Sequence, residues 1–229
     1  MTRASRLDPA FDALRERLLA LPRPAASGPP GQSGASAQTP GPAGALVVSL
    51  MSRVGGEGVT TVAVGLARAL ARVGSLRTLL IDHDSGRSGA AAQLGSSPQT
   101  FAGWTAQASA SALLDAVVDI EPGQLGLLNL GSNVPSGFAN DILWAPAYAA
   151  LRQCHDLVLV DAGSTRQPLA LRWARLVDLR LLVLDTGRTT AEELERLKVE
   201  WQANGQTLDA VVLSKRDYPV PGFLYRHVG

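Results

Sequence analysis

The stretch from residue 45 to residue 61, ALVVSLMSRVGGEGVTT, constrains the fold more than any other part of the chain. Its apolar run at 45–50 predicts a strand, and a helix is expected from residue 60 to about residue 73. The turn between these elements contains Gly55, Gly56 and Gly58. Backbone N–H groups in a glycine-rich turn, together with a helix N-terminus, form a cradle for phosphate groups. The stretch therefore predicts a phosphate-binding turn.

This turn departs from a P-loop at one position. A P-loop carries a lysine between its last glycine and its Ser/Thr pair, whereas this chain has Val59 there, followed by Thr60 and Thr61. The side-chain charge that bridges the β- and γ-phosphates is therefore missing. Losing a cation from a dry phosphate site typically removes several kcal/mol of transition-state stabilisation, or roughly three orders of magnitude in rate. Binding depends less on it, because the backbone N–H groups remain.

Carboxylates follow two further apolar strands, expected at 77–82 and 156–160. Apolar strands that alternate with helices predict an α/β fold with a doubly wound, mostly parallel sheet. Ligands of such sheets bind beyond the carboxyl ends of the strands, where Asp82, Asp84 and Asp161 are expected. We predict that Thr60, Asp82 and Asp161 bind Mg²⁺ and that Asp82 and Asp84 would be the catalytic carboxylates of an active enzyme. The alternative is that these aspartates are polar strand terminators without a ligand.

The remaining elements are predicted from hydrophobic periodicity and helix-end signals. Strands are expected at 125–130, 179–184 and 208–213, and helices at 109–118, 141–153 and 191–204. Residues 85–103 are predicted to form a loop over the site, and the tail from residue 214 an extended edge segment. His83, between two aspartates, is interpreted as a loop histidine stabilised by its acidic neighbours.

The first 44 residues divide into two parts. An amphipathic helix is predicted within residues 1–21, with Phe11, Leu14, Leu18 and Leu21 on one face. Residues 22–44 are rich in Pro, Gly, Ser and Ala, which predicts a flexible linker. The main domain is expected at 45–229. The helix would dock on its own domain or on that of a neighbouring subunit.

Composition excludes several classes of protein. A formal net charge of +1 gives no reason to expect nucleic-acid binding. The single cysteine and the absence of metal-type Cys/His spacing indicate a reducing compartment. No apolar run is long enough to span a bilayer, and the N-terminus lacks the apolar core of a signal peptide. The chain is therefore expected to be cytoplasmic, without direct membrane insertion.

Three segments resemble motifs of the bacterial tyrosine kinases (BY-kinases) of polysaccharide biosynthesis. The segment at 52–61 resembles their deviant P-loop, TLLIDHD at 78–84 their Walker A′ strand, and HDLVLVDAGS at 155–164 their Walker B strand. The resemblance covers nearly the whole chain apart from the linker. It implies a P-loop NTPase fold of the type shared with MinD and ParA. The nucleotide-binding positions that it implies are Arg53, Gly55, Gly56, Glu57, Gly58, Val59, Thr60, Thr61 and Ser214.

The resemblance also implies a biological role. Family members take Mg²⁺ and ATP or ADP, and they dock on the cytoplasmic tail of a membrane-embedded polysaccharide co-polymerase. Residues 12–16 resemble the family's oligomerisation motif, with Asp12, Arg15 and Glu16 at its charged positions, which implies a homo-oligomer. Because Val59 replaces the lysine, the chain is expected to be a catalytically impaired regulator of exopolysaccharide synthesis or export. It would act through partner binding.

Two other functions stay open. The chain would be an active ATPase or tyrosine kinase if Arg53, or a residue of a neighbouring subunit, supplied the missing cation. It would be a positioning ATPase of the MinD and ParA type if it had their signature lysine early in the loop, but Val54 stands there. The tail carries only Tyr218 and Tyr225, so a self-phosphorylating tyrosine cluster is not expected.

Overall fold

A computed structural model describes residues 9–20, 44–72, 76–83, 89–97, 110–131, 141–203 and 207–215. They form one seven-stranded sheet with helices on both faces. The strands are β1 (Leu46–Ser52), β2 (Thr78–Asp82), β3 (Val118–Glu121), β4 (Leu125–Asn129), β5 (Leu157–Ser164), β6 (Leu179–Asp185) and β7 (Ala210–Ser214). The helices are α1 (Pro9–Ala20), α2 (Val59–Ala71), α3 (Ala90–Leu94), α4 (Ala110–Asp115), α5 (Asp141–Cys154), α6 (Pro168–Leu176) and α7 (Ala191–Ala203).

The order of the strands across the sheet is β3-β4-β2-β5-β1-β6-β7. All neighbouring pairs are parallel except β3 with β4. This confirms the doubly wound α/β fold. Because β1 is central and its neighbours run parallel to it, the turn after β1 lies at the same edge of the sheet as the ends of β2, β5, β6 and β7.

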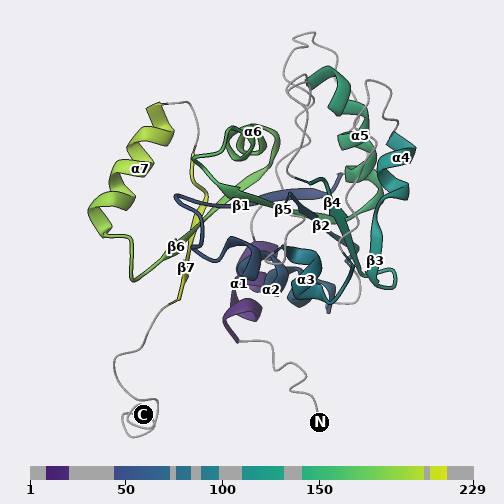
Figure 1. Ribbon diagram of the computed structural model, residues 1–229, viewed down its shortest axis with the longest axis horizontal. Coiled ribbons are helices and arrows are strands. Elements are labelled where there is room, and N and C mark those ends of the chain that lie inside the picture. The colour runs from purple at the N-terminus through teal and green to yellow at the C-terminus, as the bar shows by residue number, and fades with distance from the viewer. Residues whose placement is uncertain are drawn as a thin grey trace, which may run out of the picture.

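Each face of the sheet is covered by its own layer of helices (Figure 1). In the view of Figure 1, α1, α2 and α3 lie below the sheet, and α4, α5 and α6 lie above it. Alternate residues of β1 supply the two cores: Val47 and Met51 join the core of the α4–α7 face, while Val48 and Leu50 join that of the α1–α3 face. Because the strands are covered on both faces, their sequences are largely apolar instead of alternating.

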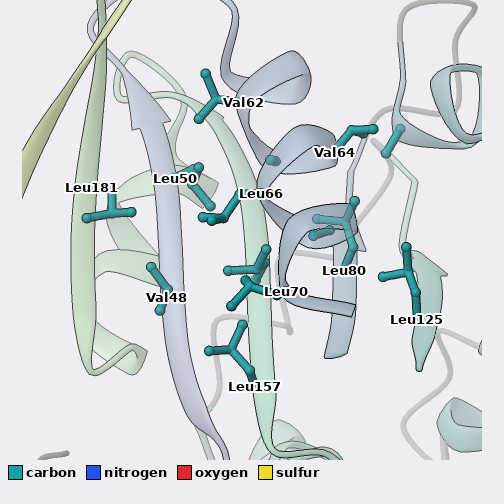
Figure 2. Packing of buried hydrophobic residues seen from close by; sticks show 14 of the residues in the cluster. Val48, Leu50, Val62, Val64, Leu66, Leu70, Leu80, Leu125, Leu157 and Leu181 are labelled. Carbon is teal, nitrogen blue, oxygen red and sulfur yellow. The ribbon is translucent and has the colours of Figure 1, made fainter. Parts of the chain in front are cut away.

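Helix α2 is the centre of the second core (Figure 2). Its Val62, Leu66 and Leu70 pack against strand residues that include Val48, Leu80 and Leu157. Helix α1 covers the other side of α2, with Leu18 almost fully buried and Phe11 lying directly on Gly65. The predicted apolar face of the N-terminal helix is thus confirmed for Phe11, Leu14 and Leu18, and the helix docks on its own chain.

Several predicted boundaries were wrong. Strand β3 and helix α6 were not predicted, and α3 lies inside the segment predicted to be a loop. Strand β5 continues to Ser164, so Asp161 lies within the strand and not after it. The linker at 22–43, Asp84, most of the predicted loop, and both tail tyrosines lie outside the described residues. None of the described helices is long and apolar enough to cross a membrane.

Candidate phosphate-binding site

The turn after β1 has the backbone of a phosphate cradle. Gly56 and Gly58 adopt left-handed conformations, with φ of 83° and 96°, which side chains rarely adopt. Gly55 has no heavy atom within 4 Å of where a Cβ would stand. Gly58 is the N-cap of α2 and offers no side chain to the first N–H groups of that helix. These amides are therefore placed to receive an anion.

Glu57 holds the turn together from inside. Its side chain is fully buried. One carboxylate oxygen accepts a hydrogen bond from the Val54 N–H at 3.0 Å, and the other accepts from the Thr189 hydroxyl at 3.2 Å. A buried carboxylate needs such donors, because burial without them is costly. Glu57 therefore shapes the loop, and its carboxylate is already engaged there.

Neighbouring strands fix the outside of the loop. The Ser164 hydroxyl, at the end of β5, donates to the Arg53 carbonyl at 3.0 Å, and the Thr165 N–H donates to the Ser52 carbonyl at 2.7 Å. The Ser214 hydroxyl, at the end of β7, donates to the Glu57 carbonyl. Ser214 was predicted as a nucleotide-binding position, and in this structure its hydroxyl supports the loop.

Val59 does not face the cradle as a ligand would. It is the first residue of α2, only 6% exposed, and it belongs to the core of the α1–α3 face. The position that carries the phosphate lysine in a P-loop is thus occupied by a core residue. Thr60 and Thr61 follow it in the first turn of α2, where Thr61 is exposed and Thr60 is half-buried.

Two of the three predicted carboxylates lie side by side. Asp82 of β2 and Asp161 of β5 are register partners, and both are buried. Asp82 accepts a hydrogen bond from the Ala90 N–H at 2.7 Å, and Asp161 accepts from the Gly163 N–H at 3.2 Å. Asp82 therefore also anchors α3. Among the described residues, which exclude Asp84, no group of three or more His, Cys, Asp or Glu side chains is arranged to hold a metal.

His83 differs from its sequence interpretation. The indole N–H of Trp173 donates to His83 Nε2 at 2.6 Å, and the ring is largely buried under α6. Burial lowers the pKa of His83 to about 4, so the imidazole is neutral near pH 7. Desolvation of the ring outweighs the hydrogen bond with the Gly131 backbone, which alone raises the pKa, so the predicted charged loop histidine is not observed.

The cations near the turn come from residues that the sequence did not single out. Lys215 Nζ contacts the Gly56 carbonyl and lies 3.2 Å from Asp185 Oδ2. A guanidinium nitrogen of Arg188 is 4.0 Å from where a Gly56 Cβ would stand. The Gly187 N–H and Lys215 together lower the pKa of Asp185. Sequence reasoning passed over the positions of these residues: Asp185 ends β6, Arg188 lies in the turn after β6, and Lys215 directly follows β7.

Arg53, the candidate replacement for the lysine, has other neighbours. Its guanidinium lies 3.8 Å from the Glu193 carboxylate of α7. It also lines a cavity between α6 and α7 that none of the turn's glycines lines.

The predicted oligomerisation residues lie on α1 and are engaged within the chain. Arg15 pairs with Asp12 at 2.9 Å and with Glu16 at 3.7 Å. Arg15 also donates to the carbonyl of Ala69 on α2, at 3.4 Å. The bond to Ala69 helps to hold α1 against α2, and a role in oligomerisation stays a prediction.

Comparison with known proteins finds relatives for most of the chain. The tyrosine-protein kinase CpsD of Streptococcus pneumoniae is 28% identical over 183 residues, which is 76% of this chain and 78% of CpsD. No family model matches the chain.

Solved structures share the fold. The VpsO kinase domain is 26% identical, with a TM-score of 0.62 over 76% of this chain and 86% of that domain. The chimerical protein CapA2B2 has a TM-score of 0.67 at 18% identity, covering 94% of this chain and 87% of the chimera. MinD of Aquifex aeolicus has a TM-score of 0.59 at 18% identity, covering 80% of this chain and 73% of MinD.

Proposed function

We propose that this chain belongs with the bacterial tyrosine kinases in the MinD/ParA-like P-loop superfamily. On that premise, it is a catalytically impaired regulator of exopolysaccharide or capsule synthesis or export. The kinship with CpsD and with the VpsO kinase domain supports the general role. The observation that carries the impairment is Val59. An isopropyl group in the core supplies no charge to a transferring phosphoryl group.

The turn still suits a nucleotide. The left-handed glycines and the open N-terminus of α2 are the features by which backbone N–H groups bind phosphate. Oxygen ligands suit Mg²⁺, and Thr60, Asp82 and Asp161 are the residues that would hold it with ATP or ADP. A bound metal would neutralise phosphate charge. Through that metal these side chains would orient the phosphates. We propose that the protein signals whether a nucleotide is bound, and that it does not depend on nucleotide hydrolysis.

Partner binding would then carry the function. The resemblance to the family suggests the cytoplasmic tail of a membrane polysaccharide co-polymerase as the partner, and a homo-oligomer as the working form. We place the protein in the cytoplasm, recruited to the inner membrane by that partner. The charged positions of α1, Asp12, Arg15 and Glu16, are the proposed subunit contacts, which requires α1 to exchange its bonds to α2 for bonds to a neighbour.

A second candidate is an active enzyme with an unusual cation. Lys215 favours it, because its ammonium already contacts the carbonyl of Gly56 in the turn. Arg188, close to the same glycine, is the next choice. Arg53 is a weaker choice than sequence reasoning suggested, since it lines a cavity that none of the turn's glycines lines.

A complementation experiment tests the regulatory role. Deleting the gene is expected to change the amount or chain length of the exported polysaccharide. Restoring the chain with Lys215→Ala should return wild-type polymer, because the regulatory role needs no cation in place of the P-loop lysine. Failure of this variant at wild-type protein levels would favour the active enzyme, and a deletion without effect on polymer would contradict the role itself.

A further inference from the structure

A basic pocket lies between α6 and α7, next to the first residue of the phosphate-binding turn. Its volume is about 470 Å³, within the range of small-molecule sites, roughly 300–1,000 Å³. Arg53, Arg166 and Arg175 line it, and Glu200 is the one acidic lining residue among those that the structure describes. No lining residue comes from the turn at 55–61 or from the strand-end aspartates. The pocket is therefore separate from the phosphate cradle.

The arginines of this pocket are poorly neutralised. Arg166 and Arg175 are exposed, and within the described part of the chain neither has a carboxylate at ion-pair distance. Arg53 has a long contact to Glu193, at 3.8 Å. The Nε of Arg53 is buried and has no hydrogen-bond acceptor among the described residues. A buried donor without an acceptor is uncommon in folded proteins and indicates a missing partner.

The pocket also has an apolar wall. Leu197 and Trp201 of α7 are 7% and 5% exposed, and Leu171 of α6 is 42% exposed at the pocket edge. Guanidinium groups bind carboxylate and phosphate oxygens in paired hydrogen bonds. A ligand that fills this pocket thus needs an oxyanion at one end and an apolar or aromatic stem at the other.

We infer that this pocket binds a small ligand that presents an oxyanion, a phosphate or a carboxylate, on an apolar or aromatic stem. The oxyanion lies against Arg53, Arg166 and Arg175, and the stem lies on Leu197 and Trp201. The inference goes beyond the proposed function, because the pocket would bind its ligand whether or not a nucleotide occupies the turn. It also depends on no identified partner.

Small probes test the pocket in the full chain. Phenyl phosphate, phenylacetate and inorganic phosphate are titrated by calorimetry and by tryptophan fluorescence. Burial of the ring should make phenyl phosphate bind about tenfold more tightly than inorganic phosphate. Binding of phenyl phosphate alone would identify a phosphate as the ligand's oxyanion, and equal binding of phenylacetate would identify a carboxylate. Failure of both aryl probes to bind would overturn the inference.

Variants locate the binding. Each of Arg166→Gln and Arg175→Gln should weaken the aryl probe by about tenfold or more, the usual effect of losing a charged hydrogen bond. Arg196→Gln is the matched control, because Arg196 lies on α7 outside this pocket, paired with Glu192. Trp201→Phe should abolish the fluorescence change and keep the calorimetric affinity. Binding unchanged in the Arg166→Gln, Arg175→Gln double variant would place the probe elsewhere, at the phosphate-binding turn, and would refute the pocket.

Discussion

At the scale of single residues, three side chains differ from the roles that their positions suggest. Val59 lies in the core, Glu57 braces the turn with its carboxylate, and Ser214 supports the loop from β7. The sequence placed all three in or beside the turn, because glycine spacing and strand ends are local patterns; their role in nucleotide binding stays a prediction. It could not show which hydrogen bonds the side chains make, because the donors come from segments more than a hundred residues away, such as Thr189 to Glu57.

His83 makes stability depend on pH. Its pKa falls from an ordinary 6.5 to about 4 in the folded chain. Between these values the unfolded chain binds the extra proton, so the free energy of unfolding decreases as pH falls from 6.5 to 4. The full loss is about 3 kcal/mol. Urea unfolding at a series of pH values measures it.

The His83→Gln variant is the control for this pH effect, and it should show a flatter profile over the same range. His155, whose pKa burial also lowers, contributes in the same direction, so His155→Gln is measured beside it. A profile that His83→Gln leaves unchanged would show that His83 is not the group responsible.

At the scale of elements, the sequence predicted best what is buried on both faces. Strands β1, β2, β4 and β6 are largely apolar, and each was predicted within two residues at either end. Strand β3, Val118–Glu121, was missed because it is polar, partly exposed and antiparallel at the sheet edge. Helix α6 was missed although Pro168 stands at its start, a recognised helix signal.

The contact between α1 and α2 depends on the small size of Gly65. A Cβ at this position would overlap the ring of Phe11. We therefore expect Gly65→Ala to destabilise the docked helix by about 1–3 kcal/mol, the usual cost of overpacking. Limited proteolysis within the first 44 residues and urea unfolding both measure the effect.

A double-mutant cycle isolates this contact. In a Phe11→Ala background the overlap is gone, and Gly65→Ala should then be neutral or stabilising by up to about 1 kcal/mol, because alanine favours helix. Equal destabilisation in both backgrounds would show that α1 does not dock on Gly65 in solution. α1 would then be free to act between subunits.

At the scale of the whole molecule, the fold brings the site residues together but does not decide whether they perform chemistry. The doubly wound sheet brings the turn, Asp82, Asp161 and Ser214 to one edge. The alternation of apolar strands with helices along the sequence predicted such an edge. The same sheet also brings Lys215 and Arg188 there. Whether the site performs chemistry therefore depends on one missing charge and on whether these two cations replace it.

Turnover of Mg-ATP by the purified chain, measured beside Val59→Lys and Asp161→Asn, tests this most directly. We expect no hydrolysis or tyrosine labelling by the wild-type chain above that of Asp161→Asn, and a gain of up to roughly three orders of magnitude in Val59→Lys, because the lysine restores the transition-state charge. Brisk wild-type turnover that Asp161→Asn abolishes would contradict the account, and its loss in Lys215→Ala would identify the substitute cation.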